Sequence, residues 1–404
     1  MKQFDIPTFY RSPIISKIKE KRKISDKLKK DFTPTIIDLG SVKFMIARHF
    51  GFCFGVENAI EIVYHTIAEH KDKRIFLLSE MIHNPHVNED LLSQGIRFLQ
   101  DTKGNQLIDW DEISTDDIVL IPAFGTTVEL EKILVSKNIN TQKYNTTCPF
   151  VERVWKRSKK LGQENHTVIV HGKHGHEETR ATFSHSKENA PTLIIQNMDE
   201  AKLLAEFIRK EKQTEDFFIL FKGRYSNDFN PEKDLSHIGV VNQTTILASE
   251  TQAISNYLQQ VISTQYGATH FADTRDTLCY ATLDNQRAAE GMLSQVADMA
   301  FVIGGYNSSN TTHLVELCET KVPTYFISSE EKIKDGGEVI HYDIHQKKEK
   351  ISTYLSSNKD ITNILITSGA SCPDALVENV LLKLMNNFGK ADDIEKVLNQ
   401  VENL

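Results

Sequence analysis

Long hydrophobic runs are missing from this sequence, and so are the features of a secreted chain. No apolar stretch approaches the roughly 18 to 20 residues that a membrane-spanning helix needs. Residues 1 to 10 lack the charged start and apolar stretch of a secretory signal. We therefore expect a cytoplasmic protein that has no membrane as a partner.

The sequence contains few cysteines, and their number is odd. Five widely spaced cysteines do not suit a disulfide framework, and the Cys-x-x-Cys pairs of many structural zinc sites are absent. The glycine motifs of dinucleotide-binding and P-loop proteins are also absent. Metal binding or redox chemistry is then the better role for some of the five, which are Cys53, Cys148, Cys279, Cys318 and Cys372.

The excess of positive charge lies in one N-terminal segment, and the rest of the chain is acidic. The 404 residues are 40% hydrophobic and 25% charged, which is typical of a folded protein of two or three domains. The net charge is −8, but residues 1–40 hold ten Lys/Arg against five Asp/Glu, so the remainder carries −13. We expect residues 17–30 to form a solvated helix or arm. The acidic remainder argues against a nucleic-acid partner.

Strands and helices alternate from residue 42 onward, which is typical of an α/β fold. A strand at 43–48 comes first, and a helix then begins directly after a cysteine three times. The expected helices are 56–69 after Cys53, 150–161 after Cys148 and 281–295 after Cys279.

Each repeat contains three strands in the same order. The first strands of the three repeats are 74–78, 167–171 and 299–304, and the second strands are 97–99, 191–195 and 323–327. The third strands are 117–122, 237–242 and 363–367. The first and third strands of each repeat run into polar loops that open helices. These loops are 83–85, 175–178 and 307–310, and 124–127, 243–245 and 368–371. Ligands gather beyond the carboxyl ends of such strands, beside helix N-termini.

The spacing predicts three small α/β units, related by a pseudo-threefold repeat, with parallel sheets flanked by helices. Cys53 and Cys148 are 95 residues apart, and Cys148 and Cys279 are 131 apart. We expect a basic N-terminal extension at 1–42, a first unit at 54–148, a second at 149–274 with an insertion near 212–236, a third from 43–53 plus 275–388, and a tail at 389–404.

A cysteine at a helix start favours a thiolate, because the helix dipole and unpaired N–H groups stabilise negative charge there. Three such thiolates suggest one shared metal centre of Cys53, Cys148 and Cys279. A 4Fe-4S cluster with three cysteine ligands leaves one iron open, as catalysis needs. Cys318 lies in an amphipathic stretch and is expected in the core. Cys372 is not expected to be a ligand.

The polar loops contain hydrogen-bond donors that suit a phosphate or diphosphate at helix N-termini. Each one alone is more often a structural N-cap, and their concentration in corresponding loops favours binding. Glu178 is either a proton relay or an ordinary first-turn glutamate. A chelate of His171, His174 and His176 is a less favoured alternative.

Seven ordered motifs resemble the 4-hydroxy-3-methylbut-2-enyl diphosphate reductases, the IspH/LytB family, over about residues 42–386. The longer cyanobacterial and plastid-type branch is the most similar. The motifs are Gly51-Phe52-Cys53-Phe54-Gly55-Val56, Ile82-His83-Asn84-Pro85, Asn145-Thr146-Thr147-Cys148-Pro149, His171-Gly172-Lys173 with His176-Glu177-Glu178-Thr179, Asn242-Gln243-Thr244-Thr245, Asn307-Ser308-Ser309-Asn310 and Ser368-Gly369-Ala370-Ser371-Cys372-Pro373-Asp374.

The resemblance implies an iron–sulfur oxidoreductase of the methylerythritol phosphate route to isoprenoids. Cys53, Cys148 and Cys279 would hold a central 4Fe-4S cluster whose open iron takes the substrate's allylic hydroxyl. Two electrons and protons would remove that hydroxyl as water, giving isopentenyl and dimethylallyl diphosphates. Glu178, Thr244 and His176 match the catalytic residues. The residues that match the substrate site are His83, His176, Thr244, Thr245, Ser308, Ser309, Asn310 and Ser371.

One position departs from the common bacterial pattern. Phe124 stands where that form has a histidine that donates to the diphosphate. The longer branch shares Ala-Phe-Gly here, so we interpret Phe124 as a branch feature, with Thr126 or Thr127 as a hypothetical replacement donor.

The resemblance also implies ferredoxin or flavodoxin as electron donor and an allylic diphosphate as substrate. Two rival functions remain. One is a non-redox hydro-lyase, in which a 4Fe-4S cluster acts on a phosphorylated substrate only as a Lewis acid. The other is a non-enzymatic iron–sulfur or zinc protein.

Overall fold

The computed structural model describes residues 4–272, 277–355 and 361–404, which form two compact units. The first unit comprises residues up to Tyr64, His83–Glu89 and Tyr280–Leu404. The second comprises His65–Ile82 and Asp90–Cys279. The helices α2 (Phe54–Glu69) and α3 (Pro85–Ser93) each begin in the first unit and end in the second.

The first unit is built on a five-stranded sheet in the order β1-β2-β14-β10-β11. The four strands from β2 to β11 are parallel, and β1 pairs with β2 in the antiparallel sense. Nearly every residue of the inner strands is buried, as expected for a parallel sheet covered on both faces. The strands are β1 (Thr35–Asp38), β2 (Val42–Ile46), β10 (Met299–Ile303), β11 (Thr324–Ile327) and β14 (Thr362–Ser368).

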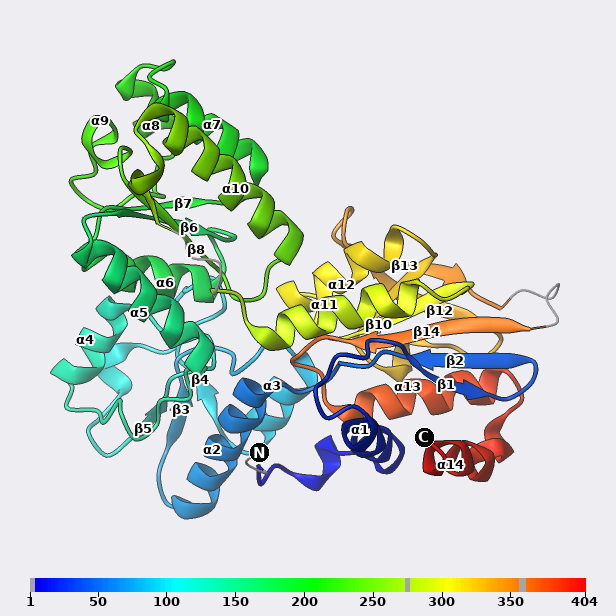
Figure 1. Cartoon of the computed structure of the whole chain (residues 1–404). Helices are drawn as coiled ribbons and strands as arrows, with labels where there is room; N and C mark the ends of the chain where they lie inside the picture. The colour runs from blue at the N-terminus through cyan, green and yellow to red at the C-terminus, as the bar shows by residue number, and fades with distance from the viewer. Residues whose placement is uncertain (1–3, 273–276, 356–360) are drawn as a thin grey trace. The chain divides into compact units, whose positions relative to one another are not determined.

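Helices cover both faces of this sheet (Figure 1). On one face lie α11 (Tyr280–Leu293) and α12 (Ser309–Glu319), and on the other lies α13 (Asp374–Asn387). The sheet and these helices share one continuous hydrophobic core. A hairpin of β12 (Glu338–Asp343) and β13 (Lys348–Thr353) follows β11, in a stretch where the sequence analysis named no strand.

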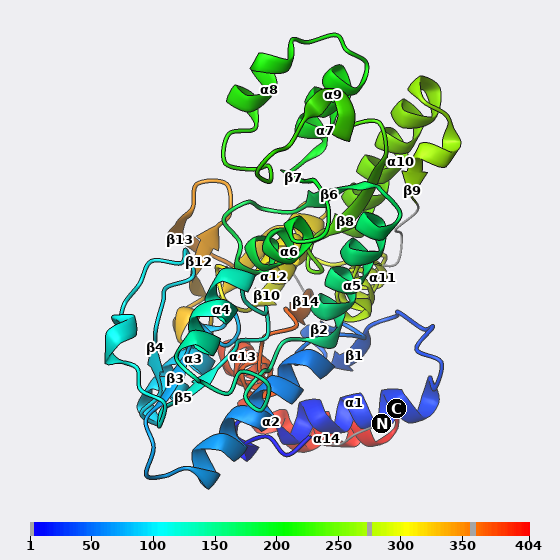
Figure 2. The same cartoon turned by 90° about the vertical axis from the view of Figure 1, so that its left-hand side faces the viewer.

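The basic N-terminal segment forms a helix over much of residues 17–30, which is one of the two forms expected for it, and within that range only Ile18 is buried. It contains α1 (Pro13–Ser25), whose side chains Ile14, Ile15 and Ile18 are buried in the core of the first unit. The C-terminal helix α14 (Ile394–Glu402) lies alongside α1 (Figure 2) and buries Val397 and Val401. An extension defined by charge therefore also carries an apolar helix face.

The second unit contains two parallel sheets. The smaller one has the order β4-β3-β5, from β3 (Ile75–Leu77), β4 (Arg97–Phe98) and β5 (Ile118–Leu120). The larger one has the order β7-β6-β8-β9. Its strands are β6 (Thr167–His171), β7 (Thr192–Ile195), β8 (Ile238–Asn242) and β9 (Phe271–Ala272).

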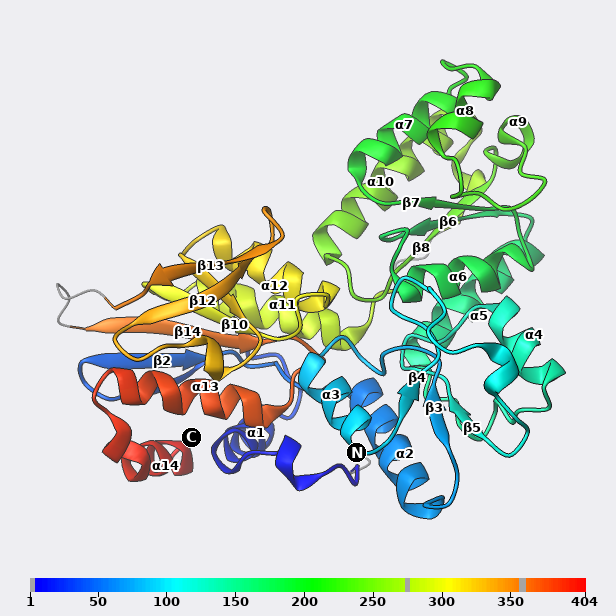
Figure 3. The same cartoon turned by 180° about the vertical axis from the view of Figure 1, so that it is seen from behind.

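Helices also cover both faces of the larger sheet (Figure 3). On one face lie α5 (Pro149–Gln163) and α6 (Glu177–Lys187), and on the other lie α7 (Met198–Ile208) and α10 (Ala248–Gln265). The α4 helix (Val128–Ser136) contacts α6.

The expected insertion near 212–236 forms α8 (Thr214–Leu220) and α9 (Pro231–Asp234). Phe217, Phe221 and Phe229 pack into the core beneath α7, and Tyr225 forms an antiparallel bridge to Leu193 of β7. This excursion is therefore folded against the edge of the sheet.

The α/β class with parallel sheets flanked by helices is confirmed, and every strand expected from the sequence is present within two residues at each end. Each of the four sheets of the described residues lies within one predicted unit, apart from β1 and the start of β2. The division into three units stays a prediction, and its boundary at 274 and 275 lies outside the described residues. No helix in the described ranges has the length and apolar character needed to cross a bilayer.

Candidate functional site

In the first unit, the predicted substrate residues gather where β10 and β14 end. Ser308 is the N-cap of α12, and its Oγ accepts the N–H of Thr311 at 3.3 Å. Ser309 and Asn310 form the first turn of that helix, and all three residues are buried. The positive end of the α12 dipole therefore faces the loop after β14, which contains Ser371.

Hydrogen bonds connect these loops to the His83 loop. The Ser371 hydroxyl donates to the His83 carbonyl oxygen at 3.2 Å, and the Ala370 N–H donates to Asn310 Oδ1 at 2.9 Å. Gly305 is needed for this approach, because a Cβ there would lie 2.4 Å from the His83 carbonyl oxygen. The structure thus brings together His83, Ser308, Ser309, Asn310 and Ser371, as the sequence analysis predicted for one substrate site.

Two buried amides in this cluster have donors without a partner in the described part of the chain: Asn84 Nδ2 and Asn310 Nδ2. Both side chains use their oxygens, since Asn84 Oδ1 accepts the Val87 N–H and Asn310 Oδ1 accepts the Ala370 N–H. Buried N–H groups without acceptors are rare in folded proteins, so they indicate a ligand that supplies acceptor atoms. Phosphate oxygens fit such donors. The sequence analysis quoted Asn84 in a motif but did not place it in the site. Its position directly before Pro85, at the start of a helix, could have indicated a role in binding.

Cys53 lies in the same unit, one residue before α2. Its N–H donates to the Ala370 carbonyl oxygen at 3.2 Å, which ties it to the loop after β14. Desolvation raises the pKa of the Cys53 thiol, while the N–H groups of Val56 and Gly55 bond to the sulfur and act to lower that pKa. Backbone N–H groups aimed at a cysteine sulfur are typical of iron–sulfur ligands.

The other two cysteines of this unit are buried. Cys318 lies in the hydrophobic core, where burial raises the pKa of its thiol to about 12, and its core assignment is confirmed. Cys372 is fully buried, and burial raises the pKa of its thiol strongly. Cys318 lies within α12 and Cys372 lies two residues before α13, so neither directly precedes a helix as the three predicted ligands do.

In the second unit, His176 and Glu178 open α6. His176 is the N-cap residue, and its ring Nδ1 accepts the Glu178 N–H at 3.2 Å. A neutral His176 ring must then carry its proton on Nε2, which makes Nε2 a donor. Glu178 is only 1% exposed, so its carboxylate is far from an ordinary solvated first-turn glutamate.

The backbone of one residue, Thr244, connects Glu178 to Cys279. The Thr244 N–H donates to Glu178 Oε1 at 2.5 Å, and the Thr244 carbonyl oxygen accepts the Cys279 N–H at 3.3 Å. The predicted relay carboxylate and a predicted metal ligand are therefore held at opposite ends of the same residue.

Gln243 supports this arrangement, and the sequence analysis did not assign it a role. Its amide Nε2 donates to Thr245 Oγ1 at 2.9 Å, while its Oε1 accepts from the Lys173 N–H and from Thr179 Oγ1, both at 3.1 Å. Gly172 leaves room for these contacts, since a Cβ there would lie 2.5 Å from Thr179 Oγ1. Gln243 thereby fixes the loop that carries Thr244 and Thr245.

Cys148 is the N-cap residue of α5, which agrees with its predicted position at a helix start. Its N–H donates to the Ala123 carbonyl oxygen at 2.9 Å, which connects it to the loop that carries Phe124. The Phe124 ring meets the His176 ring edge-on, with 5.7 Å between centroids. Thr127 is the N-cap of α4, with its Oγ1 accepting the Leu130 N–H at 3.4 Å.

The alternative metal site of three histidines is wrong. His171 is buried beside Asn242, and the His174 ring bonds to the Gly223 carbonyl oxygen at 3.1 Å. Within each unit, the described residues contain no group of three or more His, Cys, Asp or Glu side chains placed to hold a metal ion. Cys53 belongs to the first unit, and Cys148 and Cys279 belong to the second.

The fold and these loops define a parallel α/β protein with polar loops at its strand ends and cysteines at helix starts. The model of the family described as LytB protein matches residues 44–385. The "4-hydroxy-3-methylbut-2-enyl diphosphate reductase" of Microcystis aeruginosa is 37% identical over 349 residues, covering 85% of each chain. The reductase of the same name from Synechocystis sp. is 35% identical over 354 residues, covering 86% of this chain and 91% of its own. The chain therefore belongs to the LytB family.

Solved structures agree with the fold. A structure titled as the "E-1-hydroxy-2-methyl-but-2-enyl-4-diphosphate reductase from Plasmodium falciparum" has a TM-score of 0.62 at 20% identity and covers 87% of this chain and 89% of its own. A second, titled "(E)-4-Hydroxy-3-methyl-but-2-enyl Diphosphate Reductase, the Terminal Enzyme of the Non-Mevalonate Pathway", has a TM-score of 0.52 at 22% identity. The family resemblance inferred from the seven motifs is confirmed.

Proposed function

We propose that this chain removes the hydroxyl group of 4-hydroxy-3-methylbut-2-enyl diphosphate reductively, which makes isopentenyl and dimethylallyl diphosphates. The names of its relatives support this reaction. The observation that carries it is the pair of buried, unpartnered amide donors of Asn84 and Asn310 beside the N-terminus of α12. That arrangement suits a diphosphate, because it offers neutral donors and a helix dipole to a polyanion.

The reaction balances with two electrons and two protons. The carbon–oxygen bond of the allylic hydroxyl breaks, one proton makes the oxygen leave as water, and the second proton and the electron pair form the new carbon–hydrogen bond of either product. In this proposal the residues of the first unit, with His176 and Thr245, bind and orient the diphosphate. The buried Glu178 carboxylate, with Thr244 beside it, holds and delivers a proton to the departing hydroxyl.

We propose that Cys53, Cys148 and Cys279 hold a 4Fe-4S cluster. Three observations fit this group: each cysteine directly precedes a helix, Cys53 and Cys148 are partly exposed, and backbone N–H groups bond to the Cys53 sulfur. When bound, the cluster supplies the electrons and a Lewis-acidic iron position. Ferredoxin or flavodoxin would deliver the electrons, and the cytosol would be the compartment.

Anaerobic turnover tests the function against its two rivals. The purified chain, reconstituted with iron and sulfide, is incubated with the substrate, with and without a small chemical reductant. We expect isopentenyl and dimethylallyl diphosphates only when the reductant is present. Product without added electrons would identify a hydro-lyase, and a colourless protein that holds zinc in place of iron would identify a non-enzymatic metalloprotein.

Phe124→His tests whether position 124 only lines the diphosphate pocket. Phe124 contacts the His176 ring and is partly exposed, so a histidine can enter without leaving a cavity in the core. We expect the variant to keep turnover near that of the parent, with the KM for substrate unchanged or lowered, because a donor is added. Steady-state kinetics measure both constants.

The control for this variant is Phe124→Leu, which keeps an apolar side chain and adds no donor. If Phe124→His abolished substrate binding while Phe124→Leu did not, the ring would have a packing role against His176 that the imidazole cannot replace.

A further inference from the structure

The basic segment carries an exposed surface that neither the core nor the substrate site uses. Ile24, at the end of α1, is 63% exposed, and Leu28, in the following turn, is 76% exposed. Lysines surround these two side chains. They are Lys23, Lys27, Lys29 and Lys30, of which only Lys29 is partly buried. An apolar centre with a charged rim is typical of a protein–protein interface.

The turn that presents these side chains is held rigidly. Asp26 bonds to the chain around it, with Oδ1 accepting the Lys30 N–H at 3.0 Å and Oδ2 accepting the Asp31 N–H at 3.2 Å. Lys29 is in the left-handed region, at φ 53°, and its N–H donates to the Asp26 carbonyl oxygen at 3.1 Å. A preorganised turn loses little conformational entropy when a partner binds.

The chain after the turn is anchored to the first unit. A Cβ at Gly291 of α11 would lie 2.2 Å from the Phe32 carbonyl oxygen, so the segment packs directly on that helix. The Arg48 guanidinium donates to the Arg22 carbonyl oxygen at 3.2 Å, while its Nε has no partner in the described residues. These contacts fix the position of α1 relative to the end of β2.

A pocket of about 460 Å³ connects this surface to the loop that carries Cys53. The Lys29 ammonium lies 5.9 Å from the centre of the Tyr280 ring, which is 40% exposed. Desolvation, with Arg48 close by, lowers the pKa of His49 to about 4, so the positive charge comes from the lysines and Arg48. The pocket is lined among others by Lys19, Lys23, Lys29, Arg48, His49 and Cys53.

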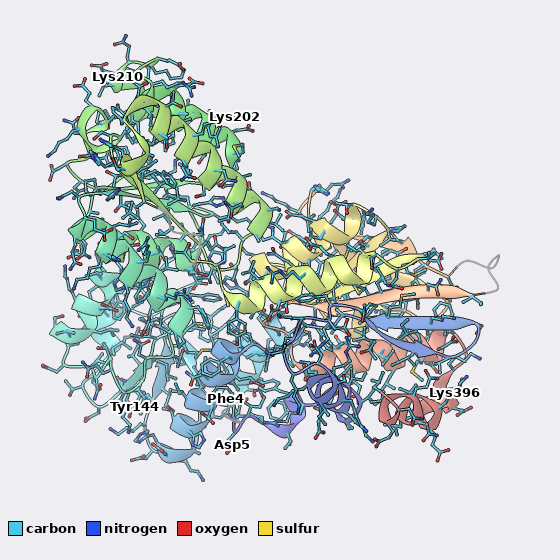
Figure 4. The ribbon with its side chains drawn as sticks, viewed as in Figure 1. Phe4, Asp5, Tyr144, Lys202, Lys210 and Lys396 are labelled. Atoms are coloured by element: carbon cyan, nitrogen blue, oxygen red, sulfur yellow. The ribbon has the colours of Figure 1, made fainter. Side chains whose placement is uncertain are left out.

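The beginning of the described chain closes the same pocket. Phe4 lies beside the first turn of α2, where its ring meets the Phe54 ring edge-on at 5.0 Å (Figure 4). Phe4, Phe52 and Phe54 all line the pocket, and Phe54 directly follows Cys53. Aromatic side chains and lysines thus line the pocket beside one predicted cluster ligand, together with the carboxylates of Glu57 and Asp284.

We propose that the surface of Lys23, Ile24, Lys27, Leu28 and Lys29 docks a small acidic electron-donor protein beside Cys53. This inference rests on the proposed function, for which electrons must reach the cysteine ligands. Charge complementarity supports it, because the basic side chains stand on a chain whose residues 41–404 carry −13. An acidic protein is attracted to this basic patch, which favours docking beside Cys53.

A nucleic acid fits this surface less well than an acidic protein does. Nucleic-acid sites track an extended backbone with a basic groove, whereas the basic side chains here form one compact patch on an otherwise acidic chain. An extended polyanion would be repelled beyond the patch.

The test is the triple variant Lys23→Glu, Lys27→Glu and Lys29→Glu, assayed with two reductants. With an acidic [2Fe–2S] ferredoxin as donor, we expect the KM for ferredoxin to rise about tenfold or more and its salt dependence to weaken, since charge reversal at a rim acts on association. With a small chemical reductant, we expect turnover to stay at the parent level. If the parent chain did not turn over with the small reductant, the proposed function would be contradicted. Ferredoxin binding to the parent and to the triple variant would then test the docking surface by itself.

The matched control is Lys202→Glu, Lys210→Glu and Lys222→Glu, three exposed lysines of the second unit, of which the first two are labelled in Figure 4. An equal rise of the ferredoxin KM in both triple variants would overturn the proposal, because it would reflect net charge alone. Binding of a 20-nucleotide single strand, tighter than ferredoxin binding and lost only in the first variant, would also overturn it.

A second variant tests the apolar centre without changing charge. Leu28→Ser should raise the ferredoxin KM severalfold, whereas Ile219→Ser on α8 should not, although Ile219 is 73% exposed and Leu28 76%. Both side chains are solvated, so neither change should alter folding, and an unchanged KM in Leu28→Ser would contradict the proposed interface.

Discussion

Cys148→Ser is expected to lose the iron and acid-labile sulfide of the reconstituted protein, together with its visible absorbance. Loss of one of three protein ligands should weaken cluster binding by more than the roughly 10- to 100-fold that loss of a supporting residue costs a metal site. Iron and sulfide analysis of protein handled without air measures the effect directly.

The structure makes this variant a clean test. Cys148 is the N-cap of α5, and serine is among the preferred N-cap residues, so the helix should form at least as well as in the parent. The Cys148 N–H bond to the Ala123 carbonyl oxygen does not depend on the side chain. A serine hydroxyl, however, replaces the thiolate as a poor ligand for iron.

The control is Cys318→Ala, which removes a thiol from the core of the first unit. Its cluster content should equal that of the parent, although the cavity lowers the stability of the fold by about 1 kcal/mol or more. Parent-level iron and sulfide in Cys148→Ser would contradict the proposed three-cysteine site.

Glu178→Gln is expected to keep the cluster and slow turnover by roughly 10²-fold or more, the usual contribution of a general acid or base. The glutamine carbonyl can still accept the Thr244 N–H, which Glu178 Oε1 accepts at 2.5 Å in the parent. The loop of Thr244, and with it the contact to Cys279, should therefore keep its place. The change removes the proton and the charge while retaining the geometry.

Glu177→Gln is the matched control for this result. Glu177 is the neighbouring buried carboxylate of the same helix turn, and it bonds to Ser79 Oγ. Its substitution should leave turnover near the parent value. If both variants were equally slow, the loss would reflect damage to the first turn of α6, and unchanged turnover in Glu178→Gln would return Glu178 to a capping role.

Local patterns in the sequence predicted most of the elements and the grouping of the first-unit loops. Strands such as Thr167–His171 and Met299–Ile303 are short apolar runs followed by polar turns, and this alternation needs no tertiary information. The helix starts after Cys53, Cys148 and Cys279 were visible for the same reason. Because parallel strands end at one edge, the loops containing Ser308 and Ser371 could be placed together before the structure was known.

The N-terminal helix shows where sequence reasoning was incomplete. Its lysines dominate the composition of the segment, so charge predicted a solvated helix or arm and gave no sign of a buried apolar face. Three isoleucines at positions 14, 15 and 18 form one face of α1, and they are buried against the core and beside α14. A short apolar face has a role only when a partner surface exists, and that surface comes from residues nearly 400 positions later in the chain.

The sequence by itself determined the α/β class, the positions of the strands along the chain, the cysteines that directly precede helices, and the family. Only the tertiary structure decided that Asn84 and Asn310 have buried donors without acceptors, and that the backbone of Thr244 connects Glu178 to Cys279. The physical reason is that elements follow from local hydrophobic periodicity, whereas hydrogen-bond satisfaction depends on which distant groups share a buried space.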